Sequence, residues 1–185
     1  GIEVAARNAP GMTVLSGPTN AMDEMTKRFA ASGVSATPLR TSHAFHSSMM
    51  DEAAETFRAD IKAIELNAPQ IPVLSNVSGQ ILSDEDAKNP DYWARQLRLA
   101  GGFAACAQTV LTGSNVVSIE VGPGRSLSNL MTLNGASHVI GGLTQGDHVA
   151  KALLAQIGKA WELGLPVNLQ KRVGQTGRRI SLPGY

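Results

Sequence analysis

The sequence predicts an α/β fold, because short β-branched segments alternate with longer segments whose apolar residues recur every three or four positions. The clearest strand is Val116–Val121, whose nearly continuous apolar run is typical of a buried parallel strand. The clearest helix begins near Met50, where apolar residues recur with helical spacing up to Ile64. With 185 residues, the chain is long enough for one domain with a small second lobe.

The N-terminal residues predict a hairpin, a helix and a further strand. Asn8-Ala9-Pro10-Gly11 supplies turn residues between two strand-like segments, and Gly33 ends a run of helical periodicity. The predicted elements are strands over Ile2–Ala6 and Met12–Ser16, a helix from Thr19 to Gly33 and a strand over Val34–Leu39. A preceding strand and helix would complete a β-α-β-β-α-β sandwich, so this part is an incomplete α+β unit.

The rest of the chain continues the alternation of helices and strands. Helices are predicted over Met50–Ile64, Asp84–Lys88, Pro90–Leu97, Phe103–Leu111, Ser126–Leu133 and Val149–Trp161. Strands are predicted over Pro72–Ser75, Val116–Val121 and His138–Ile140. From Pro166 onward the chain is polar and basic.

Composition narrows the classes of function. The net charge of +1 gives no argument for binding nucleic acid or an anionic membrane. No apolar run is long enough to span a bilayer. Cys106 is the single cysteine, so an intramolecular disulfide is excluded and a reducing, cytoplasmic location is expected. The apolar neighbours of Cys106 predict a small buried thiol and not a nucleophile.

One stretch concentrates titratable and apolar side chains. Thr41–Ser47 holds His43 and His46, with Phe45 between them. Histidine titrates closest to neutrality, so it is the default general base, and a neighbouring Phe ring can shape and dry a site. Instead of acting in catalysis, the two histidines could simply be packed or surface side chains. They could also bind a metal ion, although no convincing third ligand lies nearby in the sequence. A phosphate loop at Gly122–Arg125 is another alternative, although it lacks Gly-x-Gly-x-x-Gly spacing.

Four segments carry a family resemblance, and they occur in the family's order. They are Asn8-Ala9-Pro10 with Val14-Leu15-Ser16-Gly17, then Ser42-His43-Ala44-Phe45-His46-Ser47, then Tyr92-Trp93 through Gln96-Leu97-Arg98, and Glu120-Val121-Gly122-Pro123-Gly124. Together they resemble the C-terminal part of a malonyl-CoA:acyl-carrier-protein acyltransferase domain of a modular, type I polyketide synthase. The final Arg179–Tyr185 resembles the linker that leaves such a domain.

The resemblance implies a partial acyltransferase fold with three parts. Residues 1–41 would be part of a ferredoxin-like α+β small subdomain, and residues 42–164 the C-terminal part of an α/β-hydrolase-like large subdomain. Residues 165–185 would begin the post-acyltransferase linker. The implied reaction is ping-pong: a serine takes the malonyl group from coenzyme A and passes it to the thiol of a carrier protein.

The resemblance also assigns roles to four residues. His46 would be the general base that activates the serine, because a hydroxyl is a poor nucleophile until an imidazole takes its proton. Gln96 would orient His46 through its backbone carbonyl. His43 and Phe45 would line the acyl pocket and favour malonyl over branched extender units, with Phe45 excluding an added methyl by its volume.

Substrates and partners follow from the same resemblance. No bound cofactor is implied; malonyl-CoA is the donor and the phosphopantetheine thiol of an acyl carrier protein is the acceptor. Partners would be the N-terminal half of the acyltransferase domain, the carrier protein, and the ketosynthase with its linker. No Gly-x-Ser-x-Gly nucleophile elbow occurs in the sequence, so the chain alone is expected to be inactive.

Two alternative functions remain open at this point. The chain could be a non-catalytic fragment that acts as a scaffold or linker surface. It could also belong to a stand-alone malonyl transacylase of fatty-acid synthesis, although the Leu182-Pro183 tail argues against this, because such an enzyme needs no interdomain linker.

Overall fold

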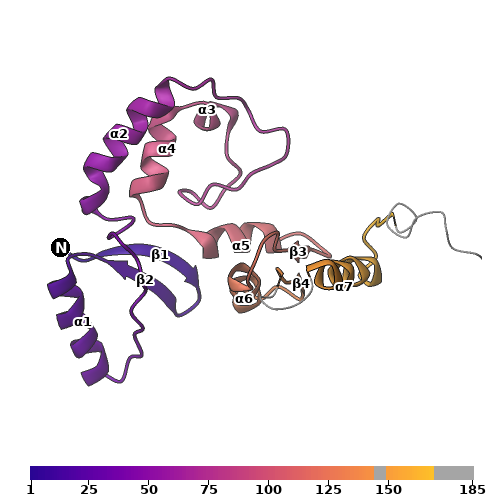
Figure 1. Ribbon diagram of the computed structural model, residues 1–185, viewed down its shortest axis with the longest axis horizontal. Helices are drawn as coiled ribbons and strands as arrows, with labels where there is room; N and C mark the ends of the chain where they lie inside the picture. The colour runs from indigo at the N-terminus through magenta and orange to yellow at the C-terminus, as the bar shows by residue number, and fades with distance from the viewer. Residues whose placement is uncertain (144–148, 169–185) are drawn as a thin grey trace, which may run out of the picture. The chain divides into compact units, whose positions relative to one another are not determined.

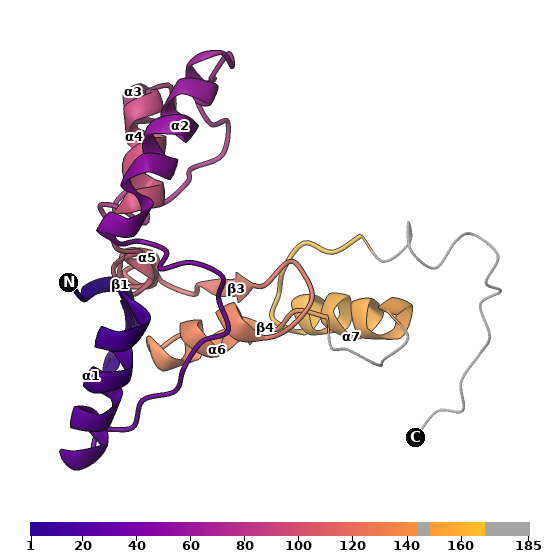
Figure 2. The same ribbon diagram turned by 60° about the vertical axis from the view of Figure 1, so that its left-hand side comes forward.

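The computed structural model describes residues 1–143 and 149–168, and these residues form two compact units. The first unit consists of Gly1–Val116 and Leu130–Ala136, and the second of Val117–Asn129 and the described residues from Ser137 onward. Helices and strands are mixed along the chain, as Figures 1 and 2 show, so the predicted α/β class is confirmed.

The chain begins with the predicted hairpin. β1 (Glu3–Ala9) and β2 (Met12–Ser16) are antiparallel, and Glu3 lies opposite Ser16. Gly11 has a φ of 71°, a left-handed conformation that glycine adopts without a steric penalty, so the sequence supplies the residue that the tight turn needs. The hairpin predicted from sequence is therefore confirmed.

β1 is also hydrogen-bonded to a distant segment of the first unit. The N–H of Arg7 donates to the carbonyl of Gly101 at 2.8 Å, and the N–H of Gly101 donates to the carbonyl of Ala5 at 2.9 Å. α5 (Phe103–Leu111), which begins two residues later, contacts β1. These bonds fix the hairpin relative to the residues that precede α5.

α1 (Thr19–Ala31) forms as predicted, but the strand predicted after it does not. Gly33 ends the helix with a φ of 71°, and the N–H of Val34 donates back to the carbonyl of Phe29. The segment 34–39 has no regular structure. A strand exists only when its backbone groups pair with a neighbour, and no described segment pairs with these residues, so this prediction is wrong.

The middle of the chain forms a small helical lobe. η1 (Ser48–Met50) leads into α2 (Asp51–Lys62), and α2 lies beside α4 (Pro90–Arg98) in both views (Figures 1 and 2). α3 (Asp84–Ala87) is a single turn that precedes α4. The start of α4 is fixed locally: Pro90 occupies its first turn, and the N–H of Asp91 donates to the Asn89 side chain at 2.9 Å.

The strand predicted over Pro72–Ser75 is reduced to one bridge. Leu74 pairs antiparallel with Ile81, and the N–H of Leu82 donates to the carbonyl of Val73 at 2.8 Å. Pro72 has no N–H, so the ladder cannot gain another donor at that position. The prediction of a short strand here is wrong, and residues 76–78 after it form a turn.

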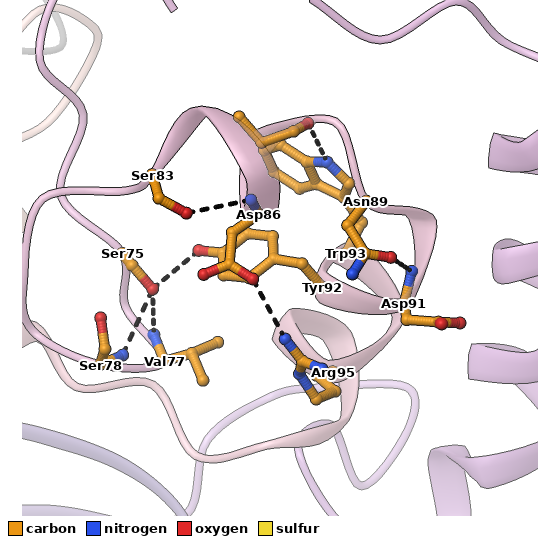
Figure 3. A network of polar contacts seen from close by, with 11 residues as sticks. Ser75, Val77, Ser78, Ser83, Asp86, Asn89, Asp91, Tyr92, Trp93 and Arg95 are labelled. Carbon is orange, nitrogen blue, oxygen red and sulfur yellow. Dashed lines mark hydrogen bonds and ion pairs between the residues drawn. The ribbon is translucent and has the colours of Figure 1, made fainter. Parts of the chain in front are cut away.

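The lobe has a small core around a buried tyrosine. Leu82, Ala87 and Tyr92 are buried together, and Trp93 packs against them. The Tyr92 hydroxyl donates to the Oγ of Ser75 at 2.8 Å (Figure 3). The same oxygen accepts the N–H groups of Val77 and Ser78 at 3.2 and 3.3 Å, so one hydroxyl fixes the turn against the helix.

The second unit contains a short parallel sheet. β3 (Val117–Ile119) pairs in parallel with β4 (His138–Ile140), and α7 (Val149–Glu162) contacts β4. α6 (Ser126–Leu133) follows β3. The parallel pairing and both helices match the prediction.

The sequence predicts that the strand over Val116–Val121, which contains β3, is buried, and this prediction is wrong. Ile119 is 50% exposed and Val121 is 94% exposed. Buried parallel strands need helices on both faces, and the second unit as described does not supply both layers.

The Ser75 hydroxyl gives a stability prediction. Ser75→Ala should lower the free energy of unfolding by about 1–3 kcal/mol, because the buried Tyr92 hydroxyl loses its acceptor. Tyr92→Phe should cost less, since Ser75 keeps two N–H donors. Urea unfolding of both variants measures the order, with exposed Ser114→Ala as the control. An equal or larger cost for Tyr92→Phe would contradict the arrangement.

Candidate active site

The turn that carries the two histidines is closed by a buried serine. Ser47 is 0% exposed, and its hydroxyl donates to the carbonyl of Ala44 at 2.6 Å. The same oxygen accepts the N–H of Met49 at 3.3 Å, and the N–H of Met50 donates to the carbonyl of Ser47 at 2.9 Å. Ser47 therefore joins the turn before it to the start of η1 after it.

His46 lies in a strained part of this turn. Its φ is 58°, in the left-handed region, which costs a non-glycine residue about 1 kcal/mol. The residue is half-buried, and its Nδ1 atom is buried without a hydrogen-bond partner in the described part of the chain. Strain and an unsatisfied polar atom at one residue are typical of a functional site, because both need an explanation outside local folding.

His43 and Phe45 lie together on the exposed side of the turn. Their ring centroids are 6.0 Å apart and the rings are tilted by 58°. The Nδ1 atom of His43 is 2.9 Å from the hydroxyl of Ser42, and Phe45 is 41% exposed. The structure therefore brings these two predicted residues into contact next to His46, and leaves both accessible.

Gln96 is half-buried near the end of α4. The N–H of Leu99 donates to the carbonyl of Arg95 at 2.7 Å, and the chain then leaves the helix, since Leu99 is extended. Within the described residues, no backbone N–H donates to the Gln96 carbonyl, so it can accept a hydrogen bond from another group. α4 contacts η1, but no hydrogen bond joins His46 to Gln96 in the described structure.

The structure adds a residue that the sequence pattern does not reveal. The carboxylate of Glu3 accepts the N–H of Ser48 at 2.6 Å through Oε1 and pairs with Nη1 of Arg98 at 3.0 Å through Oε2. Arg98 also pairs with Asp51 through its Nε atom. Glu3 and Ser48 are 45 residues apart in the sequence, and neither residue type signals the contact.

These contacts change the acidity of the groups involved. The pKa of Glu3 is lowered from 4.5 to about 2, first by the hydrogen bond from the Ser48 N–H and further by Arg98. The pKa of Arg98 is raised, with Asp51 as the largest cause and Glu3 contributing. Both groups therefore stay charged across the neutral range.

A second carboxylate organises the Gly-Pro-Gly turn of the second unit. Glu120 accepts the N–H groups of Leu127 and Ser128 at 3.1 and 2.9 Å, and also the Ser128 hydroxyl. The pKa of Glu120 is lowered, first by the Ser128 hydroxyl. A protein carboxylate thus occupies the N-terminus of α6, where a phosphate would have to bind, which argues against the phosphate-loop alternative.

Other candidate chemistry finds little support in residues 1–143 and 149–168. No group of three His, Cys, Asp or Glu side chains in these residues could hold a metal ion. Cys106 is buried, as predicted, and burial raises the pKa of its thiol, which is 3.4 Å from the Ser75 carbonyl. No helix in these residues combines the length and apolar character that crossing a membrane requires.

Comparison with known families gives the class of protein to which this mixed α/β chain belongs. Residues 1–156 match the family model described as the acyl transferase domain, so the chain belongs to this family. The predicted resemblance to acyltransferases of polyketide synthases is confirmed. Over its whole length, the chain is 30% identical to one component of the phenolphthiocerol/phthiocerol polyketide synthase of Mycobacterium tuberculosis. It is 32% identical to the spectinabilin polyketide synthase system protein NorB of Streptomyces orinoci.

Solved structures give the same result for the fold. The acyltransferase domain from the second module of the salinomycin polyketide synthase matches with a TM-score of 0.84 and 30% identity, over 98% of this chain. The acyltransferase domain of ZmaA matches with a TM-score of 0.83 and 26% identity, also over 98% of this chain. This chain covers 44% and 43% of those two structures, and 13% and 9% of the M. tuberculosis and S. orinoci relatives.

The shifted pKa of Glu3 predicts an acid dependence of stability. A carboxyl whose folded pKa is lowered stabilises the protein above its ordinary pKa of 4.5, and this contribution is lost as the pH falls through about 2. Glu3→Gln should therefore make the free energy of unfolding less dependent on pH between these values. Urea unfolding across this range tests it, with the exposed Glu24→Gln of α1 as the matched control. Parallel pH profiles for wild type and Glu3→Gln would contradict it.

Proposed function

We propose that this chain is part of a polyketide synthase acyltransferase domain that moves a malonyl unit from coenzyme A, through a serine ester, to the thiol of an acyl carrier protein. The observation that carries the proposal is His46: a half-buried imidazole with an unpartnered Nδ1, in a strained turn of a chain that belongs to the acyl transferase family. Structural histidines are normally satisfied, whereas a base must keep its nitrogens for the reaction.

His46 acts in this proposal as the general base. One ring nitrogen takes the proton of the serine hydroxyl, and the other must be held so that the correct tautomer faces the serine. The Nδ1 atom of His46 is buried without a hydrogen-bond partner in the described residues, and in the tautomer where it carries the proton it needs an acceptor; the Gln96 carbonyl has no backbone donor in the same part of the chain. We assign Gln96 to this role, so its backbone position matters and its side chain does not.

Phe45 and His43 form the wall of the acyl pocket in this proposal. Both side chains are accessible and in contact with each other beside the base. A Phe ring in this position would occupy the volume that a branched extender unit needs. The acyltransferase domain of SpnD was solved in complex with 2-(pent-4-yn-1-yl)malonyl, a malonyl unit branched at its α-carbon, so it supports a malonyl-type substrate and leaves the choice between branched and unbranched units to side chains such as Phe45.

The remaining machinery would come from outside this chain. The sequence contains no Gly-x-Ser-x-Gly elbow, so the serine is supplied by the rest of the acyltransferase domain, and the chain alone is inactive. Residues 1–41 would complete a ferredoxin-like small subdomain, and residues 42–164 an α/β-hydrolase-like large subdomain. The proposed linker, residues 165–185, lies mostly outside the described residues. The carrier protein and the ketosynthase are the expected partners.

The role of His46 predicts a large loss of acyl loading. In the intact acyltransferase domain, His46→Ala should slow formation of the malonyl-enzyme by roughly two to four orders of magnitude, the usual effect of losing a general base. Intact-mass measurement of the loaded enzyme over time tests this. His138→Gln, which changes an exposed histidine of β4, is the matched control and should load normally. If His46→Ala forms the malonyl-enzyme at the wild-type rate, His46 is not the general base.

The volume of Phe45 predicts a change in selectivity. His43→Tyr combined with Phe45→Ser should raise the share of methylmalonyl loading by about tenfold, because rejection of one methyl is worth roughly 1–3 kcal/mol. Competition between malonyl-CoA and methylmalonyl-CoA, followed by mass spectrometry, measures the ratio. Phe57→Ser on α2 removes a similarly exposed ring and serves as the control. An unchanged ratio would place selectivity elsewhere in the domain.

A further inference from the structure

Glu3 joins the two backbone segments that carry the proposed base and its orienting carbonyl. Ser48, whose N–H donates to Oε1 of Glu3 at 2.6 Å, lies two residues after His46. Arg98, whose Nη1 is 3.0 Å from Oε2 of Glu3, lies two residues after Gln96. One carboxylate thus connects the histidine turn to the C-terminal end of α4, with one oxygen for each.

Glu3 is itself held in place by the backbone. It belongs to β1, where it lies opposite Ser16, and the following residues of β1 are hydrogen-bonded to Gly101, three residues after Arg98. The side chains of Glu3 and Arg98 are 33% and 26% exposed, whereas those of the Glu55–Arg58 pair on α2 are 65% and 37% exposed. The Glu3 pair is therefore partly shielded and rigidly supported, unlike an ordinary surface ion pair.

Arg98 extends the connection to a third segment. Its Nε atom pairs with Asp51, the first residue of α2, immediately after η1. The guanidinium therefore binds a carboxylate from the hairpin and a carboxylate from the helix that follows the histidine turn, which fixes its plane and the direction of its donors.

We propose, on the basis of the function proposed above, that Glu3 is a positioning residue: it holds the left-handed turn at His46 close to the end of α4, within reach of the proposed orienting carbonyl of Gln96. Ser47 closes the turn from inside through its hydroxyl, and Glu3 holds it from outside through the Ser48 N–H. Without the outer contact, the strained backbone at His46 can relax and the imidazole loses its fixed direction.

The backbone geometry at Ser48 allows a specific test. A proline at this position would restrict the backbone without needing the hydrogen bond from the Ser48 N–H to Glu3. Ser48 is the first residue of η1, a position where proline is well tolerated. Ser47 before it is extended, with φ −132° and ψ 173°, a conformation that residues preceding proline favour. Ser48→Pro thus removes the N–H that Glu3 accepts and fixes the backbone covalently instead.

The experiment is a double-mutant cycle in the intact acyltransferase domain. Single-turnover loading by malonyl-CoA is measured for wild type, Glu3→Ala, Ser48→Pro and the double variant, with His46→Ala as the reference and Glu24→Ala of α1 as the matched control. Glu3→Ala, which removes the acceptor of the Ser48 N–H, should lower the loading rate at saturating malonyl-CoA by about tenfold, with the half-saturating concentration unchanged. In the Ser48→Pro background, Glu3→Ala should cause a smaller loss, because only the pair with Arg98 is left to remove.

Each outcome decides for or against the proposal. If Glu3→Ala loads at the wild-type rate while His46→Ala does not load, Glu3 is only structural and the proposal is wrong. The proposal is also wrong if substitution of Glu3 lowers the loading rate equally in the wild-type and Ser48→Pro backgrounds, because Glu3 would then not act through its contact with Ser48. If His46→Ala loads normally, the assignment of the base fails, and with it the function on which this proposal rests.

A readout without turnover complements the kinetics. The imidazole carbon–proton resonance of His46, assigned by its absence from His46→Ala, should broaden or shift in Glu3→Ala while that of His138 stays unchanged. An unchanged His46 signal in the folded variant overturns the proposal. If Glu3→Ala does not fold, Arg98→Lys replaces it, since a single ammonium cannot keep the same fork between Glu3 and Asp51. This variant should show a smaller loss of loading, and a wild-type rate would overturn the proposal.

Discussion

The left-handed backbone at His46 is the constraint on which the candidate site depends. A β-carbon in this conformation crowds the following carbonyl, so the turn persists only because its surroundings over-determine it. Two polar contacts do so: the fully buried Ser47 hydroxyl inside the turn and the Glu3 carboxylate outside it. The strained turn holds an imidazole whose Nδ1 has no hydrogen-bond partner within the described residues, which leaves this nitrogen for an orienting or reacting group.

Carboxylates that accept backbone N–H groups recur in both units. Glu3 binds the first N–H of η1, and Glu120 binds the N–H groups of Leu127 and Ser128 at the start of α6. Each lies in or directly after a strand and accepts donors from the first turn of a helical segment. Both pKa values are lowered as a result, so these connections weaken only in acid. A chain with 17% charged residues thus uses two of its acids as structural acceptors.

Burial within the described residues is local and modest. The core of the first unit gathers around Tyr92 and Leu82, while large apolar side chains such as Ile71 and Val121 are 76% and 94% exposed. Apolar surface of this kind is normally covered in a folded domain. This agrees with the coverage of the solved relatives, of which the chain spans less than half.

The sequence by itself determined the elements whose signals are local and the stretch that carries the base. The Gly33 stop and the helical periodicity after Met50 predict helices that form, and His43, Phe45 and His46 lie within four residues of one another in the sequence itself. The segments 34–39 and Pro72–Ser75 have strand-like sequences, but a strand also needs a paired neighbour; in the described structure the first segment has none and the second has only the bridge from Leu74 to Ile81. Only the tertiary structure revealed Glu3, because its partners at positions 48 and 98 are distant in the sequence and reach its carboxylate only in the folded chain. A single ion pair also produces no periodic pattern in a sequence.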